Sequence, residues 1–203
     1  MTLKKFQESY KENKFNYYFL ELLAKIMEIL GEEMIYRGRK ISLKKVFLKI
    51  RGKTTFHEVV LFGQAVAILP FKGNKIVLLK QYRSPVGGWI YEIPAGKIEE
   101  GESPEETCAR ELIEETGYKP NYLEKLISVY TTPGYSNEVL HIFIARDLKF
   151  VGQRLTDYEI IKTIEIPYTE LLQKIRNGEI IDGKTIIAVL YYELFKRHRD
   201  KTL

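Results

Sequence analysis

The sequence predicts a mixed α/β fold with one main domain. Short β-type segments follow one another between residues 34 and 82, a helix is well marked at about residues 104–116, and two further helices close the chain. Strands and helices therefore mix within one core. With 203 residues, of which 45% are hydrophobic, the chain is long enough for one good-sized domain and a small accessory unit.

The first part of the chain predicts a helix outside this core. Residues 16–30, NYYFLELLAKIMEIL, place apolar side chains at helical spacing, and Gly31 is typical of a helix C-terminus. The polar face of this helix carries no basic stripe, so packing against the chain or a second copy is favoured over binding to a membrane surface. We expect a helical extension over residues 1–33.

The next part predicts a run of strands. Turns containing Gly or Lys, such as KGNK, separate the segments MIYRG, VFLKIRG, HEVVLFG, AVAILPF and KIVLLKQYR. Later strands are expected in LISVYTTPG, VLHIFIARDL and KTIEIPYTE, and helices in TELLQKIRNGE and KTIIAVLYYELFKRHRD. We assign residues 34–60 to a small N-terminal β unit and residues 61–203 to the main domain.

The composition narrows the class of protein. The longest apolar runs contain Gly, Gln and Pro and are shorter than the roughly 20 residues of a transmembrane helix. The charged N-terminus lacks the apolar stretch of a secretory signal, and the single cysteine, Cys108, allows no internal disulfide. We therefore expect a cytoplasmic protein. The net charge of +5 is spread along the chain among Glu residues, which favours a solvated surface over a nucleic-acid groove.

The central helix is specified by its own ends. Ser103 and Glu106 form a capping box around Pro104, and Gly117 stands where a left-handed terminator belongs. At 100° per residue, one side of the helix is apolar, and a cluster of three carboxylates lies on the other: Glu111, Glu114 and Glu115.

These three carboxylates repel one another, and none has a Lys or Arg four residues further on within the helix. An ordinary solvated face is one interpretation. Divalent metal binding is favoured over it, because hard oxygen ligands on a rigid element suit Mg²⁺ or Mn²⁺, and the cation would hold the acids ionised. His and Cys are too sparse nearby for a zinc site.

The same helix belongs to a longer pattern. Gly96 is followed by five residues, Glu102, seven residues and then RELIEETGY, which ends at Tyr118. This resembles the Nudix box, G-x5-E-x7-R-E-U-x-E-E-x-G-U with U aliphatic, and departs from it only at Tyr118. The resemblance implies an α/β/α sandwich with a mixed β-sheet. It also implies Mg²⁺-dependent hydrolysis of a nucleoside diphosphate linked to another group, with Mn²⁺ able to substitute.

The resemblance also implies a role for each matching residue. Glu111 and Glu115 are expected as the main metal ligands, with the Ala95 carbonyl beside them and Glu114 serving an additional metal. The supporting residues are Arg110, which orients the acids, the carboxylate Glu102, and the glycines Gly96 and Gly117.

Sequence outside the box resembles the ADP-ribose pyrophosphatase subgroup of this family. Pro133 lies 16 residues past Gly117, and QYR, HEVVLFGQAVAIL and NGEIIDGKTIIAVLYY are similar to that subgroup, so the resemblance covers residues 34–195. It implies hydrolysis of ADP-ribose to AMP and ribose 5-phosphate. It also implies a homodimer whose N-terminal strands exchange between chains, an interface that the predicted N-terminal helix would extend.

The subgroup suggests further site residues. Arg83 would bind the diphosphate, whose oxygens suit the planar guanidinium fork, and Glu138 would accept hydrogen bonds from the terminal ribose. Tyr36 and Trp89 are candidates for stacking on adenine, although each also suits a core or an interface. The general base is expected in a mobile loop at Glu159, with Asp157 as the alternative.

Two other functions compete with this interpretation. A hydrolase of GDP-mannose or another nucleoside diphosphate sugar would share the architecture and most of the motifs. A non-catalytic module that binds nucleotides or nucleic acid would suit the basic pI of about 9.0. The intact acid cluster argues against such a module, which has no need of repelling carboxylates.

Overall fold

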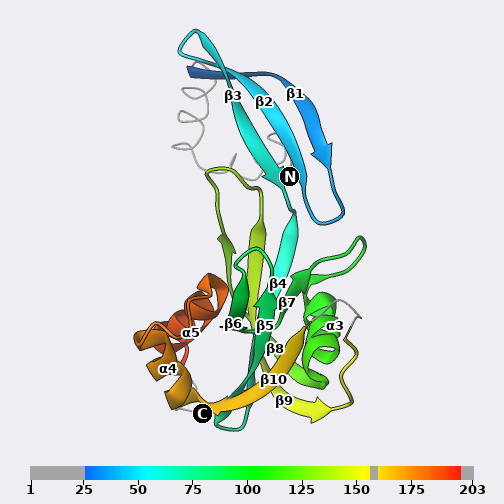
Figure 1. Ribbon diagram of the computed structural model, residues 1–203, viewed down its shortest axis with the longest axis vertical. Helices are drawn as coiled ribbons and strands as arrows, with labels where there is room; N and C mark the ends of the chain where they lie inside the picture. The colour runs from blue at the N-terminus through cyan, green and yellow to red at the C-terminus, as the bar shows by residue number, and fades with distance from the viewer. Residues whose placement is uncertain (1–25, 156–159, 198–203) are drawn as a thin grey trace, which may run out of the picture. The chain divides into compact units, whose positions relative to one another are not determined.

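The computed structural model describes residues 26–155 and 160–197 and divides the chain into two compact units. Unit 1 contains the chain up to Phe62 together with the loop Thr132–Asn137, and unit 2 contains the remainder. Figure 1 shows the order of the elements in each unit.

Unit 1 is a three-stranded antiparallel sheet in the order β1-β2-β3, formed by Met27–Arg37, Ser42–Ile50 and Lys53–Leu61. The tight turn between β2 and β3 places Arg51 and Gly52 at φ 49° and 79°, which is the backbone that matches the twist of a two-residue hairpin. The loop 132–137 joins the end of β3, where Val60 N donates to Tyr135 O at 2.8 Å.

The prediction of an N-terminal helix is wrong for the residues that form the start of strand β1. Residues 27–30 are extended rather than helical, and residues 16–25 lie outside the described residues. Glu28 and Ile29 pair with Lys49 and Leu48 on β2, so a charge pair and an apolar pair across the two strands outweigh the helical spacing. Gly31 lies at a register shift within β1 and does not end a helix.

Unit 2 contains a seven-stranded mixed sheet. Its main path has the order β10-β5-β4-β9-β8, with β6 paired to β5 and β7 to β4. The strands are β4 (Gln64–Lys72), β5 (Lys75–Arg83), β6 (Gly88–Glu92), β7 (Ala95–Lys97), β8 (Tyr118–Tyr130), β9 (Val139–Phe150) and β10 (Ile161–Pro167). β4 and β9 run parallel, whereas the other pairs are antiparallel.

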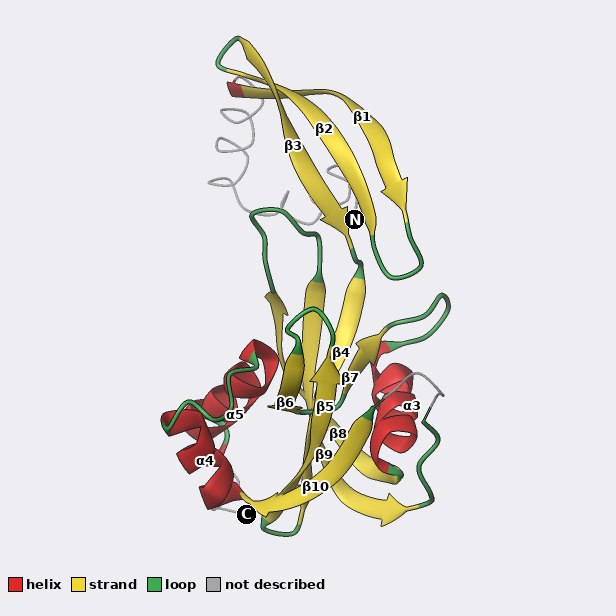
Figure 2. Ribbon diagram, viewed as in Figure 1, coloured by secondary structure: helices red, strands yellow, loops and turns green. Residues whose placement is uncertain are grey.

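Helices cover both faces of this sheet, which confirms the predicted sandwich. The helix α3 (Pro104–Thr116) lies on one face, and α4 (Tyr168–Arg176) and α5 (Gly183–Phe195) lie on the other, as Figure 2 shows. The residues from Ala65 to Pro70 on β4 are all buried, as expected for a central strand that is covered on both sides. Cys108 and Leu112 of α3 pack on Val66 and Phe143 in the core beneath the helix.

Candidate active site

The ends of α3 have the predicted caps. Ser103 Oγ accepts a hydrogen bond from Glu106 N at 3.2 Å, and Glu106 Oε2 accepts one from Ser103 N at 2.8 Å. Gly117 adopts φ 78° and donates its N–H to Ile113 O at 2.8 Å. A side chain at Gly117 would also meet Phe150, so both space and backbone conformation favour glycine here. The caps fix where the acidic face of α3 begins and ends.

Strand β7 lies directly against this acidic face. A Cβ atom on Gly96 would overlap the Glu111 carboxylate, so the absence of a side chain lets that carboxylate approach the backbone of β7. One residue earlier, Ala95 N donates to Glu115 Oε2 at 3.0 Å. Glu115 is only 4% exposed. Two of the three helix carboxylates therefore meet the Ala95–Gly96 backbone.

Arg110 donates hydrogen bonds to three acids, which are Glu102, Glu111 and Glu114. Its Nε and Nη2 donate to the two carboxylate oxygens of Glu102 at 2.7 and 2.9 Å, which is a bidentate pair. Its Nη1 donates to Glu111 Oε1 at 2.8 Å and to Glu114 Oε2 at 3.2 Å. The hydrogen bonds from Arg110 lower the pKa of Glu102 to about 2, and those to Glu102 raise the pKa of Arg110. The Arg110 guanidinium therefore lies among three closely spaced carboxylates.

A second charged group, of which the sequence indicated only Arg83, lies on the neighbouring strands. Arg83 at the end of β5 donates from Nε and Nη2 to Glu92 at 2.8 and 2.9 Å, and Lys184 Nζ also donates to Glu92. Glu92 is fully buried. A lone Glu in the apolar segment WIYEIPAG was the signal available in the sequence, but its two cationic partners come from other elements.

The network of Glu92 extends to the start of α5. Asp182 caps this helix by accepting from Thr185 N at 3.0 Å, and it also accepts from Lys184 Nζ at 3.0 Å. Burial alone would lower the pKa of Arg83, but its hydrogen bonds to Glu92 and the charges of Glu92, Glu115 and Asp182 raise it overall. Arg83 is therefore held within the electrostatic reach of the buried acid of α3.

Comparison with known protein families identifies the family to which this chain belongs. The family model described as the NUDIX domain matches residues 61–186. The chain belongs to the Nudix family. The matched region contains the acidic helix, β7, Arg83, Glu92 and the start of α5.

Curated relatives of this Nudix protein cover most of its length. It is 42% identical over 166 residues to the methanol dehydrogenase activator of Bacillus methanolicus, a match that covers 80% of this chain and 90% of the relative. It is 37% identical over 169 residues to the ADP-ribose pyrophosphatase of Bacillus subtilis strain 168, covering 81% and 91%. The GDP-mannose pyrophosphatase of Yersinia enterocolitica is 34% identical over 141 residues, covering 65% and 73%.

Solved structures support the same fold. The Nudix protein matches a crystal structure of an ADP compounds hydrolase with a TM-score of 0.77, 22% identity and coverage of 86% of this chain and 96% of that one. Within residues 26–155 and 160–197, no helix is both long and apolar enough to cross a membrane.

The donor groups of this Nudix protein fit a hard divalent cation. Glu111, Glu114 and Glu115 supply carboxylate oxygens on one rigid helix, and the missing side chain of Gly96 leaves the Glu111 carboxylate beside a strand backbone. As they stand, no three acidic, His or Cys groups among the described residues converge on one point. Glu111 and Glu114 instead contact Arg110, so metal binding requires them to turn from its guanidinium.

The other predicted site residues lie in different places. Glu138 accepts from Thr131 Oγ1 at 2.6 Å, and Trp89 on β6 is 45% exposed with its ring 6.0 Å from that of Tyr82. Tyr36 and Pro133 belong to unit 1, and Tyr36 is 57% exposed. The two candidates for the general base, Asp157 and Glu159, lie outside the described residues.

Tyr118, the departure from the Nudix box, has a structural explanation. Its hydroxyl accepts a hydrogen bond from Lys72 Nζ at 2.7 Å and donates one to Glu165 Oε1 at 2.7 Å. Lys72 also pairs with Glu165 at 2.6 Å. The ring is 8% exposed and packs edge-on against Phe150. Tyrosine therefore serves the apolar core and a polar contact between β4 and β10.

Proposed function

We propose that this Nudix protein hydrolyses the pyrophosphate bond of ADP-ribose to AMP and ribose 5-phosphate with Mg²⁺, for which Mn²⁺ can substitute. The observation that carries the proposal is a pair of features in unit 2: carboxylates of α3 packed on the Ala95–Gly96 backbone, and Arg83 held in place by buried Glu92. The first suits a divalent cation, and the second suits a diphosphate.

The choice of substrate is supported by similarity to the ADP-ribose pyrophosphatase of Bacillus subtilis, which extends over 91% of that protein. In this proposal Glu111, Glu115 and the Ala95 carbonyl would hold the main metal, and Glu114 an additional one. Bound there, the metal would neutralise the pyrophosphate charge and lower the pKa of a bound water.

The protein's own residues would bind and orient the substrate. Arg83 would donate its remaining N–H groups to the diphosphate, with Glu92 fixing the plane of its guanidinium. Arg110, anchored to Glu102 by its bidentate pair, would orient Glu111 and Glu114 as they turn towards the metal. Glu138 would accept hydrogen bonds from the terminal ribose, and Glu159 or Asp157 would take the proton from water.

A homodimer in the cytoplasm completes the proposal. Of the described residues in the strands of unit 1, only Leu48 is buried, whereas a set of large apolar side chains is more than 40% exposed: Ile29, Leu30, Met34, Ile35, Tyr36 and Phe56. A three-stranded sheet with so little core needs a partner surface. A second copy would supply it and would bring Tyr36 or its counterpart to an adenine site. Light scattering coupled to size exclusion would give twice the 23.8 kDa chain mass.

One experiment tests the substrate and the metal together. Purified protein is assayed with ADP-ribose, GDP-mannose and NADH, each with Mg²⁺ and with EDTA, beside the variants Glu115→Gln and Glu170→Gln. We expect Mg²⁺-dependent release of AMP that is fastest from ADP-ribose, collapses in Glu115→Gln and is unchanged in Glu170→Gln, whose side chain is exposed on α4.

Other outcomes would select a different function. Turnover of GDP-mannose alone would keep the metal chemistry and replace the substrate, in line with the Yersinia relative. No turnover of any of the three, with binding that weakens steeply as salt increases, would favour a nucleic-acid-binding module.

A further inference from the structure

A polar side chain in the sheet of unit 2 is buried without a hydrogen-bond partner. Gln81, on β5, is 6% exposed, and its Oε1 atom is the single buried side-chain polar atom that lacks a partner among the described residues. Its neighbours across the two adjoining strands are Ile90 on β6 and Ile161 on β10, which offer no polar side chain. A buried, unpaired acceptor lowers the stability of the folded protein. An amide turned by 180° would bury an unpaired N–H instead, at a similar cost.

Gln81 lies on the face of the sheet that carries the candidate active site. Side chains two positions apart on a strand point to the same face, so Gln81 shares its face with Val77 and Arg83. Val77 packs with Cys108 and Leu112 of α3 in one core cluster. Arg83 is the residue proposed to bind the diphosphate, and two residues advance a strand by only about 7 Å. The Gln81 carboxamide is therefore a neighbour of the proposed diphosphate site.

The same face of β5 leads from Gln81 towards the acidic helix. Leu79, the preceding side chain on this face, is opposite Thr163 on β10. The Thr163 hydroxyl donates to Glu115 O at 3.2 Å. Gln81 thus lies along β5 between the level of Thr163 and that of Arg83. A ligand that is held both by Arg83 and by a metal at Glu115 would pass Gln81.

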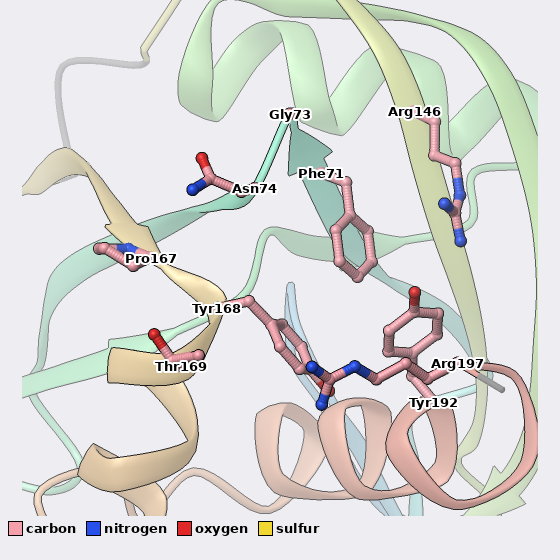
Figure 3. A pocket seen from close by; sticks show the side chains of 9 residues that line it. All are labelled: Phe71, Gly73, Asn74, Arg146, Pro167, Tyr168, Thr169, Tyr192 and Arg197. Atoms are coloured by element: carbon pink, nitrogen blue, oxygen red, sulfur yellow. The ribbon is translucent and has the colours of Figure 1, made fainter. Parts of the chain in front are cut away.

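Polar groups beside the helices on the opposite face have partners within the protein. Figure 3 shows a pocket of about 300 Å³ there, with Arg146 and Arg197 among the residues that line it. Arg197 pairs with Glu193, and Tyr168 Oη donates to the same carboxylate at 2.9 Å. The N–H of Tyr168, at the start of α4, donates to Asn74 O at 3.0 Å. The unpaired amide is thus a feature of the α3 face.

We propose that the Gln81 carboxamide binds a sugar hydroxyl group of a nucleoside diphosphate sugar whose diphosphate is held by Arg83. This role rests on the proposed function. A free acceptor requires a donor; diphosphate oxygens provide none at neutral pH, whereas each sugar hydroxyl both donates and accepts. The terminal torsion of glutamine is soft, so the carboxamide can turn towards the ligand while β5 stays in place. Gln81 would then add recognition of the sugar to the recognition of the diphosphate by Arg83.

A variant without the unpaired group should gain stability. Gln81→Met keeps the length and approximate volume of the side chain and removes its polar atoms, so the urea midpoint of unfolding should increase. Gln64→Met is the matched control on β4, where Gln64 Oε1 lies 2.9 Å from His141 Nε2. Loss of that hydrogen bond should lower the midpoint. A lower midpoint in Gln81→Met as well would show that its amide has a partner in the free protein and would overturn the proposal.

Calorimetric titration of the full chain in EDTA measures binding without turnover. The probes are ADP-ribose, GDP-mannose and inorganic pyrophosphate. We expect the Kd of the sugar nucleotide to increase about tenfold in Gln81→Met and to stay constant in Gln64→Met. Pyrophosphate carries no hydroxyl group and should bind equally to wild type and Gln81→Met, whereas Arg83→Gln should weaken both kinds of probe. An equal weakening for pyrophosphate in Gln81→Met would overturn the proposal, because the effect would then not depend on a sugar hydroxyl.

Turnover of ADP-ribose with Mg²⁺, recorded beside these titrations, separates this role from the proposed function. An unchanged Kd in Gln81→Met, with normal turnover by the wild type, would overturn the role of Gln81 and keep the proposed function. A tenfold weaker binding in a protein that does not hydrolyse ADP-ribose would keep the role and contradict the proposed function. The absence of binding of either sugar nucleotide up to about 10 mM would overturn both.

Discussion

A Cβ atom at position 96 would occupy the space of the Glu111 carboxylate. We therefore expect Gly96→Ala to displace Glu111 from strand β7 and to lower kcat for ADP-ribose about 100-fold, since a displacement of about 1 Å at a catalytic group has this scale of effect. Steady-state kinetics would measure the loss. Gly31→Ala is the control, because a Cβ there meets nothing within 4 Å. Equal activity of the two variants would contradict the prediction.

Glu92 is expected to act through Arg83. Glu92→Gln keeps the volume of the side chain but removes the charge that holds the Arg83 guanidinium in a bidentate pair. We expect KM for ADP-ribose to increase about tenfold with little change in kcat, because the lost contact serves bound substrate and transition state alike. The control is Glu170→Gln, whose carboxylate is 3.8 Å from Lys174 on the surface. A fall in kcat at constant KM would assign Glu92 a different role.

The pair of Glu102 with Arg110 predicts a dependence of stability on pH. The folded pKa of Glu102 is about 2, below its usual value of 4.5, so the folded state gains stability from this group above pH 4.5. That gain is lost as the pH falls from about 4.5 towards 2. The difference in free energy of unfolding between wild type and Glu102→Gln should shrink across this interval in urea titrations. A difference that is constant from neutral pH to pH 3 would exclude this linkage.

Tyr118 is expected to contribute to stability. Tyr118→Phe removes the hydroxyl that accepts from Lys72 and donates to Glu165, and it should lower the free energy of unfolding by about 1 kcal/mol. Tyr122→Phe removes a hydroxyl that lies 3.5 Å from Glu124 on an exposed ring and should have almost no effect. Urea denaturation of both variants makes the comparison, and equal losses would show that the Tyr118 contacts add nothing specific.

Local signals in the sequence were sufficient for α3 and its acids. Ser103, Pro104 and Gly117 act within one turn of the helix ends, so the limits of α3 and its buried side follow from neighbouring residues. Glu111, Glu114 and Glu115 lie within five residues of one another, so their position on one side of the helix also followed from neighbouring residues. The glycine that lets Glu111 approach β7, Gly96, was already part of the same sequence pattern.

Other features depend on partners that are distant in the sequence. Residues 27–30 have helical spacing, but β2 pairs with them and makes them extended. Glu92 meets Lys184 across 92 positions, and no local pattern reports that its carboxylate is buried between two cations. The pocket around Arg146 and Arg197 likewise combines β4, β9, α4 and α5. Tertiary contacts decide such sites, so periodicity and motif spacing miss them.

The parallel pairing of β4 with β9 constrains the order of folding. It joins residues 64–70 to residues 139–145, about 75 positions apart, so the chain between them must be closed into a loop before the pair can form. That loop contains α3, β7 and Arg83. Contacts between residues so far apart in the sequence form slowly. The caps of α3 involve neighbouring residues, so they can form long before the acids of α3 contact the sheet. In pulse-labelling hydrogen exchange, the amides of α3 should therefore gain protection before those of the central β4 ladder.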